Sequence, residues 1–222
     1  MEKLPPIFVI SLKNSPRRHT ISQRLNALNL KFTFLDGING ATLAQDALNN
    51  IDYTFYPERF DARRPLTIGE IGCAMSHLSI YQIMCNEQIE QAIILEDDAI
   101  VSQEFEYIVL DSLKKVPKKC DILFYEHGKA KSYFFKKNLI EGYRLVHYKS
   151  PSKHSKRTIT RATAYLITKE GADKLLKLAY PIRMPADYLT GALQLNGLNA
   201  YGVEPPCVFR GTDSEIDAME HR

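Results

Sequence analysis

Several familiar motifs are missing from this chain of 222 residues. It has no G-x-G-x-x-G, Walker A, HExxH or G-x-S-x-G motif, which removes the simplest dehydrogenase, ATPase, metalloprotease and α/β-hydrolase interpretations. The four cysteines form no C-x-x-C pair, so we expect neither a zinc ribbon nor a thioredoxin motif. Cys73 and Cys85 fall about 18 Å apart on one expected helix, too far for a disulfide. We therefore expect free, buried thiols.

Long apolar runs and a strong charge of one sign are missing as well. The run after Pro6 has only about six apolar residues, fewer than a signal peptide needs, and no run approaches the roughly 20 residues of a membrane span. These absences predict a protein that stays in the cytoplasm. A net charge of +3 gives little support to nucleic-acid binding. Apolar residues at 45% and charged residues at 25% are typical of globular proteins, and we expect one domain over residues 1–222.

Hydrophobic periodicity predicts an α/β fold. Apolar, β-branched and aromatic runs predict strands at residues 6–12, 31–35, 91–95, 120–125 and 163–167. Helical spacing predicts helices at residues 18–28, 67–85 and 105–113, another through residue 178, and a last one near residue 185. Thr67-Ile-Gly-Glu70 matches a capping box at the start of the second helix. The strand at 91–95 is almost entirely apolar and is expected to be central, and the opening order of strand, helix and strand favours a parallel sheet.

Charge is distributed unevenly along the chain. Between Lys129 and Arg161, ten basic residues accompany a single acid, Glu141. We interpret residues 127–161 as a basic insertion with weak periodicity, and two interpretations stay open. One is a solvated or mobile loop. The other is a surface that meets phosphates, either on an anionic membrane leaflet or on a phosphorylated substrate.

The sharpest chemical pattern is Glu96-Asp97-Asp98, directly after the strand at 91–95. In an extended chain Glu96 and Asp98 share one face, while Asp97 points to the other. Oxygen ligands with this spacing suit Mg²⁺ or Mn²⁺, with substrate phosphates completing the coordination. Open α/β sheets also bind their ligands beyond the carboxyl ends of the strands. The alternative is a solvated acidic turn that caps the next helix, and the triplet alone does not decide between the two.

Other polar residues have both a structural and a chemical interpretation. Arg17 and Arg18 follow the first strand, where they would either hold a diphosphate or lie exposed at a helix start. His77, inside the helix at 67–85, is either a ligand or a core histidine with satisfied hydrogen bonds. Asp187 lies near a helix start, so it either caps that helix or acts as a general base.

Four blocks of residues then resemble glycosyltransferase family 25, which includes bacterial lipooligosaccharide enzymes and collagen galactosyltransferase domains. They follow the family order and span almost the whole chain: Phe8-Val-Ile-Ser-Leu12 with Arg17-Arg18, Gly69-Glu-Ile-Gly-Cys-Ala-Met-Ser-His77, Ala92-Ile-Ile-Leu-Glu-Asp-Asp98 and Thr163-Ala-Tyr-Leu-Ile167. The resemblance implies a GT-A-like, Rossmann-type mixed sheet flanked by helices. It also implies an inverting transfer of a hexose, most often galactose, from a UDP-sugar donor to a sugar hydroxyl.

The resemblance also implies roles for individual residues. Its D-x-D-type motif falls on Glu96, Asp97 and Asp98, which would hold the donor diphosphate through a divalent cation, Mn²⁺ first and Mg²⁺ second. Glutamate replaces the first aspartate, which leaves open which carboxylates touch the metal. Asp187 is the first choice for the general base, with Asp213 in reserve, and His221 is a weak candidate for a late metal ligand. The residues expected to bind the donor are Ser11, Arg17, Arg18, Glu70, His77 and Asp97.

Two classes of function follow from these patterns. The first is a glycosyltransferase that acts on the lipooligosaccharide or lipopolysaccharide core, with the basic insertion favouring an anionic acceptor and peripheral contact with the inner face of the bacterial inner membrane. The second is a non-catalytic sugar-nucleotide-binding or scaffold protein with the same fold. An intact acidic triplet favours the enzyme.

Overall fold

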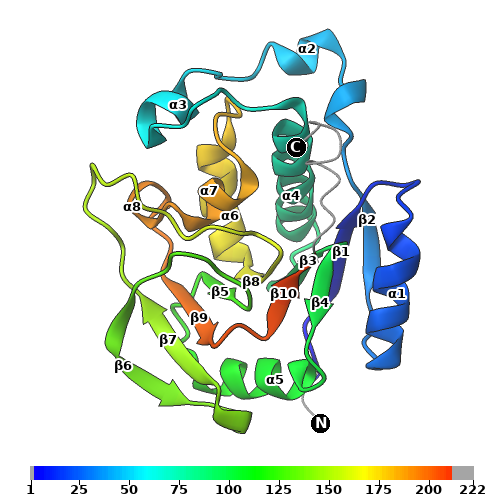
Figure 1. The fold of residues 1–222 in the computed structure, drawn as a ribbon, viewed down its shortest axis with the longest axis vertical. Coiled ribbons are helices and arrows are strands. Elements are labelled where there is room, and N and C mark those ends of the chain that lie inside the picture. Colours follow the sequence, from blue (N-terminus) through cyan, green and yellow to red (C-terminus); the bar gives the residue numbers. More distant parts are fainter. Residues whose placement is uncertain (1–2, 212–222) are drawn as a thin grey trace.

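The structure is a computed structural model that describes residues 3–211, and it is organised around one eight-stranded sheet (Figure 1). The strand order is β2-β1-β3-β8-β5-β9-β7-β6, and a separate two-stranded ribbon pairs β10 with β4. The strands are β1 (Ile7–Ser11), β2 (Thr33–Asp36), β3 (Gln91–Glu96), β4 (Ala99–Val101), β5 (Ile122–Phe124), β6 (Ser132–Asn138), β7 (Arg144–Tyr148), β8 (Ala164–Thr168), β9 (Ala200–Glu204) and β10 (Val208–Arg210).

Strand directions in the sheet are mixed. β1 runs parallel to both β2 and β3, and β5 runs parallel to β9. β8 lies antiparallel between β3 and β5, while β7 is antiparallel to β9 and to β6. The predicted fold class, an α/β fold with a mixed sheet flanked by helices, is confirmed. β3 is an interior strand, as its apolar sequence predicted.

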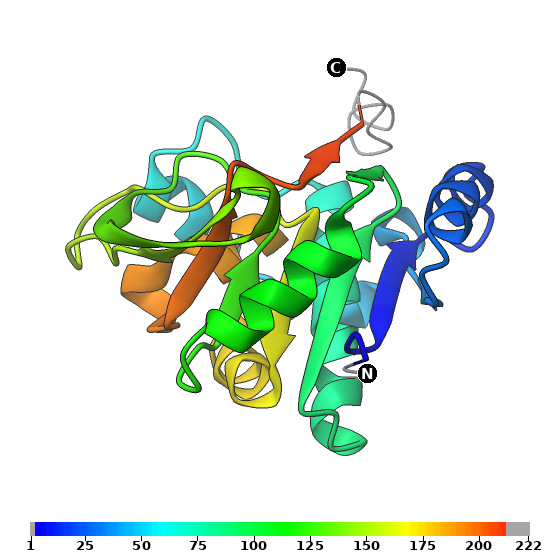
Figure 2. The ribbon, with the colours of Figure 1, turned by 90° about the horizontal axis from the view of Figure 1, so that it is seen from below.

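Helices cover both faces of the sheet, and each face has its own apolar core (Figures 1 and 2). One core includes residues of α4, α6, α7 and α8, and the other includes residues of α1 and α5. β3 serves both cores because its side chains alternate: Ala92 and Ile94 face the first, Ile93 and Leu95 the second. The helices are α1 (Arg17–Ala27), α2 (Gln45–Leu48), α3 (Phe55–Phe60), α4 (Ile68–Asn86), α5 (Phe105–Lys115), α6 (Lys169–Ala179), α7 (Ala186–Gly191) and α8 (Leu193–Asn196), with 3₁₀ turns η1 (Gly40–Thr42) and η2 (Ile140–Gly142).

Helix α4 begins at the predicted capping box and presses closely on the loop after β2. The Thr67 hydroxyl accepts a hydrogen bond from the Glu70 amide at 3.2 Å, and the Glu70 carboxylate accepts one from the Thr67 amide at 2.9 Å. A Cβ added at Gly72 would lie 2.4 Å from the carbonyl oxygen of Ile38. Only glycine allows this backbone approach, which fixes the helix start against one wall of the cleft described below.

Part of the basic insertion is a β-hairpin, while residues 149–161 contain no helix or strand. Instead of an irregular segment, residues 132–148 form the hairpin of β6 and β7, which extends the sheet at one end. The thiols of Cys73, Cys85, Cys120 and Cys207 are free as predicted, but only Cys120 and Cys207 are fully buried. Among residues 3–211, no helix has both the length and the apolar character needed to cross a bilayer.

Candidate functional site

A cleft opens beyond the carboxyl ends of β1 and β3, beside the first turns of α4. The space in and around the cleft, open solvent included, is about 690 Å³. Two strand ends, one helix and the β4–β10 ribbon meet there, which is where an α/β sheet is expected to bind a ligand. The polar and small residues of the lining include Ser11, Arg17, Gly37, Asn39, Gly69, Cys73, Ser76, Glu96, Asp97, Asp98 and Arg210.

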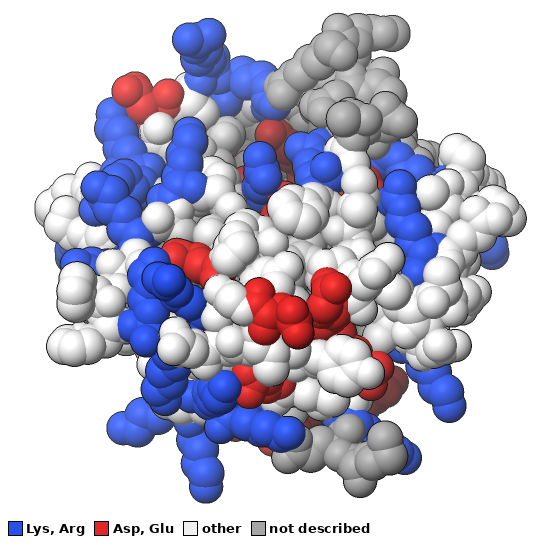
Figure 3. Space-filling view, turned by 60° about the horizontal axis from the view of Figure 1, so that its bottom comes forward, with Lys and Arg blue, Asp and Glu red and all other residues white. Residues whose placement is uncertain are grey.

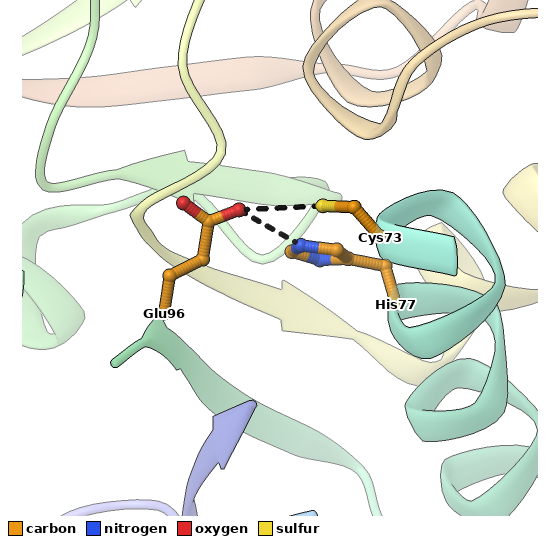
Figure 4. Close-up of side chains that lie close together, drawn as sticks. All are labelled: Cys73, His77 and Glu96. Carbon is orange, nitrogen blue, oxygen red and sulfur yellow. Dashed lines mark hydrogen bonds and ion pairs between the residues drawn. The ribbon is translucent and has the colours of Figure 1, made fainter. Parts of the chain in front are cut away.

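The three acids of the triplet have three different sets of partners. Glu96, at the end of β3, points toward α4, where its Oε1 lies 3.3 Å from His77 Nε2 and 3.7 Å from Cys73 Sγ (Figure 4). Asp97 turns to the loop after β1 and accepts hydrogen bonds from Ser11, Ser15 and Arg17, at 2.6, 3.2 and 3.3 Å. Asp98 accepts a hydrogen bond from Arg210 Nε at 3.1 Å.

Asp98 carries the clearest electrostatic anomaly of the site. Burial, followed by the nearby charge of Glu96, raises the pKa of Asp98 to about 7, although Arg210 opposes the shift. Its Oδ1 atom is buried and has no hydrogen-bond partner among the described residues. A buried carboxylate oxygen without a donor is costly, and a cation next to it would remove that cost.

The pKa of Glu96 is shifted in the opposite direction, downward. Burial disfavours its charged form, but the hydrogen bond and charge of His77 outweigh it and hold the pKa of Glu96 below its ordinary value. The ligand atoms of Cys73, His77 and Glu96 lie within 4.8 Å of one another, close enough for all three to contact one metal ion. The end of β3 therefore presents Glu96 beside a thiol and an imidazole, and the Asp98 carboxylate is near enough to be affected by the charge of Glu96.

His77 is held by a chain of buried hydroxyl groups. Its side chain is fully buried, and its Nδ1 lies 2.7 Å from the Tyr165 hydroxyl, which lies 2.5 Å from the Tyr81 hydroxyl. Burial raises the pKa of both tyrosines, so both stay neutral. This row of hydrogen-bonded groups links strand β8 to helix α4 and fixes the imidazole that contacts Glu96. The structure thus gives His77 satisfied hydrogen bonds and also places it beside the acidic triplet.

The structure separates the two arginines that follow β1. Arg17 lines the cleft and bonds to Asp97. Arg18 has a different set of partners. It donates to the Ser11 carbonyl at 2.8 Å and pairs with Asp36, and its guanidinium carbon lies 4.7 Å from the centre of the Phe34 ring. Arg17 is therefore the better placed of the two to meet a bound anion.

The carboxylate of Glu70 has structural partners. Besides the capping bond to the Thr67 amide, it accepts hydrogen bonds from both terminal nitrogens of Arg64, at 2.8 and 3.1 Å. Such a bidentate pair fixes the position of both side chains. Glu70 therefore organises the helix start beside the cleft, and the cleft lining on this turn comes from Gly69.

Asp187 lies in the first turn of α7 with a partly buried side chain. Its Oδ2 accepts a hydrogen bond from the Arg161 amide at 3.2 Å. Burial raises its pKa to about 6, and the charges of Glu96 and Glu70 act in the same direction, which places Asp187 within electrostatic range of both. The reserve candidates Asp213 and His221 lie outside the described residues.

Sequence reasoning missed three polar residues near the site. Arg210 reaches Asp98 because β10 pairs with β4, a contact across 112 positions for which the local sequence has no signal. Ser15, in the loop between β1 and α1, was not singled out from the sequence, although its hydroxyl donates to Asp97. Arg161 was counted only as one charge of the basic insertion, whereas its guanidinium bonds at 2.8 Å to the fully buried Glu126 and its amide bonds to Asp187.

Comparison with known proteins gives a family match over most of the chain. The model of glycosyltransferase family 25 (LPS biosynthesis protein) matches residues 4–190. A glycosyltransferase 25 family member of Aedes aegypti is 36% identical over 95 residues, which are 41% of this chain and 16% of that protein. Human procollagen galactosyltransferase 2 is 29% identical over 102 residues, 45% of this chain and 16% of that protein. This chain thus spans less than a fifth of either relative.

Among solved structures, A197 from STIV aligns with 95% of this chain and 96% of its own at 11% identity, with a TM-score of 0.47. The family match, over residues 4–190, includes β1, the acidic triplet, α4 and Asp187. On that match, which covers most of its length, this chain belongs to glycosyltransferase family 25.

Proposed function

We propose that the chain transfers a hexose from a UDP-sugar to a sugar hydroxyl, with inversion at the anomeric carbon, and that the hexose is galactose. The observation that carries the proposal is the buried Oδ1 of Asp98, which has no hydrogen-bond partner within residues 3–211 and lies on a cleft that also presents Arg17 and Arg210. A diphosphate bridged by a cation would satisfy both kinds of group. The family membership and the galactosyltransferase named among the relatives favour galactose as the sugar.

The residues present suit a divalent cation, Mn²⁺ first and Mg²⁺ second. Oδ1 of Asp98 has no hydrogen-bond donor in the part of the chain that the structure describes, and Glu96 lies close enough for the charges of the two carboxylates to influence each other. Asp97 is less suited, since its carboxylate already accepts three hydrogen bonds. We therefore assign Asp98 and Glu96 as the ligands and give Asp97 the role of holding the loop after β1. When bound, the cation would neutralise charge on the departing UDP.

The arginines of the cleft would act on the same charge. Guanidinium groups form paired, charge-assisted hydrogen bonds to phosphate oxygens. Arg17 comes from α1 and Arg210 from β10, so they approach the triplet from two different elements. Both are already fixed by carboxylates, Arg17 by Asp97 and Arg210 by Asp98. Groups fixed before the reaction stabilise developing charge without reorganising.

Asp187 would accept the proton of the acceptor hydroxyl at its carboxylate. A pKa of about 6 leaves it ionised at neutral pH and makes it a stronger base than an ordinary aspartate. Such a base contributes a factor of roughly 10²–10⁴ in rate. For the acceptor we propose the sugar core of lipooligosaccharide or lipopolysaccharide, in keeping with the description of the family.

The test is UDP release from UDP-galactose with an oligosaccharide acceptor, measured with Mn²⁺, with Mg²⁺ and with a chelator. We expect release to depend on the cation and to fall at least a hundredfold in Asp98→Asn, while the exposed Asp46→Asn control keeps the parental rate. Product linkage analysis then reports the stereochemistry. UDP binding without any release in the parental protein would support the non-catalytic sugar-nucleotide-binding alternative instead.

A further inference from the structure

Strand β6 exposes the largest apolar side chains of the basic hairpin. Phe134 is 91% exposed and Phe135 is 88% exposed, and the preceding Tyr133 is 46% exposed. The two phenyl rings touch each other edge to face, with centroids 5.9 Å apart. Two neighbouring phenylalanines left this open are unfavourable in water, and such patches commonly mark an interaction surface.

An irregularity in the strand pairing places these rings outside the sheet. Ser132 pairs with Tyr148 and Lys136 pairs with Val146. Three residues, Tyr133 to Phe135, therefore lie opposite the single residue His147. A bulge of this kind breaks the ladder locally and redirects side chains. We call Tyr133, Phe134 and Phe135 the aromatic bulge.

Basic side chains border the aromatic bulge. Lys131 and Lys149 lie side by side at the open end of the hairpin, where the Lys149 amide donates to the Lys131 carbonyl at 2.8 Å. The Lys149 ammonium group lies 5.1 Å from the centre of the Tyr133 ring. Lys129 is exposed just before them. On the face shown in Figure 3, Lys and Arg side chains are frequent on the left side, where Figure 1 places β6 and β7.

The acids near the hairpin do not cancel this charge. Glu204 on the neighbouring strand β9 pairs with Lys136, and Asp111 on α5 pairs with Lys115. Glu141 is the one acid between residues 129 and 161, against ten bases in the same segment. The hairpin therefore combines protruding aromatic rings with an excess of positive charge.

We propose that the aromatic bulge inserts into the headgroup region of an anionic lipid bilayer, with Lys129, Lys131 and Lys149 beside it contacting lipid phosphates. Aromatic rings favour this region because it accepts apolar surface next to water. Each lysine near an anionic surface adds about 1 kcal/mol of attraction. Pairing with β6 of a second copy is the less favoured occupant, because lysines on an edge strand oppose such pairing.

The test is co-sedimentation of the full chain with vesicles of phosphatidylcholine alone or mixed with phosphatidylglycerol. We expect binding to the mixed vesicles only, weakened by salt because exposed charges are screened. The variant Phe134→Ser/Phe135→Ser should bind at least about tenfold more weakly, since it removes the apolar anchor. The variant Lys129→Gln/Lys131→Gln/Lys149→Gln should lose about fivefold for each charge removed.

Two matched controls keep the result specific to this surface. Tyr107→Ser removes a 67% exposed ring from α5, and Lys31→Gln removes an exposed charge just before β2. Both should bind vesicles like the parental protein. All of these side chains are exposed, so the thermal unfolding temperature should stay close to parental in every variant.

Parental binding by the double phenylalanine variant, or equal binding to neutral vesicles, would overturn the proposal. So would a parental dimer in sedimentation velocity that the double variant dissolves, since the bulge would then join two copies of the chain. UDP release in vesicle-free solution separates this inference from the proposed reaction. If vesicle binding behaves as expected and no UDP is released, only the proposed reaction fails.

Discussion

The replacement of Asp98 by asparagine gives a quantitative test of the electrostatics of the acidic triplet. Each tenfold change in acidity corresponds to about 1.4 kcal/mol, so a pKa raised from 3.8 to about 7 means that ionised Asp98 costs the folded state roughly 4 kcal/mol. Asparagine has nearly the same shape and never ionises. The raised pKa already includes the opposing ion pair with Arg210, and an amide does not reproduce every contact of the protonated carboxyl group, so we expect a net stabilisation of about 1–3 kcal/mol at pH 8.

The direction with pH follows from linkage. The folded-state pKa of Asp98 lies above the unfolded value, so protonation favours the folded state and the ionic cost grows from about pH 4 to pH 7. The stabilisation by Asp98→Asn should accordingly be small at pH 4 and complete above pH 7. Mn²⁺ should raise the stability of the parental protein at pH 8 and that of the variant much less, because the variant lacks the anionic ligand.

Urea unfolding at pH 4.5 and pH 8, with and without Mn²⁺, measures these differences. For a chain of this size, 1 kcal/mol corresponds to roughly 2–4 °C in the unfolding temperature, so thermal scans would resolve the effect as well. The matched comparison is the adjacent Asp97→Asn, which should be destabilising by about 1–3 kcal/mol because Asp97 accepts three hydrogen bonds. If metal-free Asp98→Asn were less stable than the metal-free parental protein at pH 8, the interpretation of Asp98 as a buried carboxylate that destabilises the fold when ionised would be refuted.

Three further predictions concern the elements around the cleft. His77→Phe removes the imidazole that contacts Glu96, so it should lower stability by about 2–4 kcal/mol and raise the Mn²⁺ concentration needed for half-maximal UDP release, which denaturation and metal titration measure. Gly72→Ala should cost at least about 1–3 kcal/mol in urea unfolding, because its methyl group would collide with the Ile38 carbonyl, and a parental midpoint would contradict the close packing. Asp187→Asn should lower turnover by about 10²–10⁴ while UDP still binds in calorimetry. In the parental protein the rate should fall as pH drops through about 6, where Asp187 takes up a proton, and a rate that is flat between pH 5 and pH 7 would exclude this residue as the base.

The interior of the fold was largely predictable because it depends on local pattern. The apolar run of β3, the capping box of α4 and the periodicity of α5 each indicate their element within the residues that form it. The direction of β8 was not predictable in this way. Its five residues are mostly apolar and buried, and a strand with this sequence pattern can run either parallel or antiparallel to its neighbours.

The hairpin and parts of the site were harder to predict for different reasons. β6 has no clean alternation because the bulge places three residues opposite one, and this removes the period-two signal on which strand prediction depends. For Asp98, the sequence shows an acid after a strand but not the burial that raises its pKa. Arg210 depends on the pairing of β10 with β4, and that long-range contact sets the partner of Asp98.

The buried tyrosine hydroxyls that contact His77 have a consequence for how the site around Glu96 adapts to charge. Tyr81, Tyr165 and His77 are joined by short contacts, and each hydroxyl hydrogen can be directed either way along the row. With the hydroxyl hydrogens turned one way, the Tyr165 oxygen accepts a hydrogen bond from Nδ1 of His77; with them turned the other way, the Tyr165 hydroxyl donates to Nδ1, and the ring hydrogen is on Nε2, facing Glu96. Both arrangements use the same carbon, nitrogen and oxygen positions. The site can thus be retuned from within a rigid interior by moving hydrogens alone.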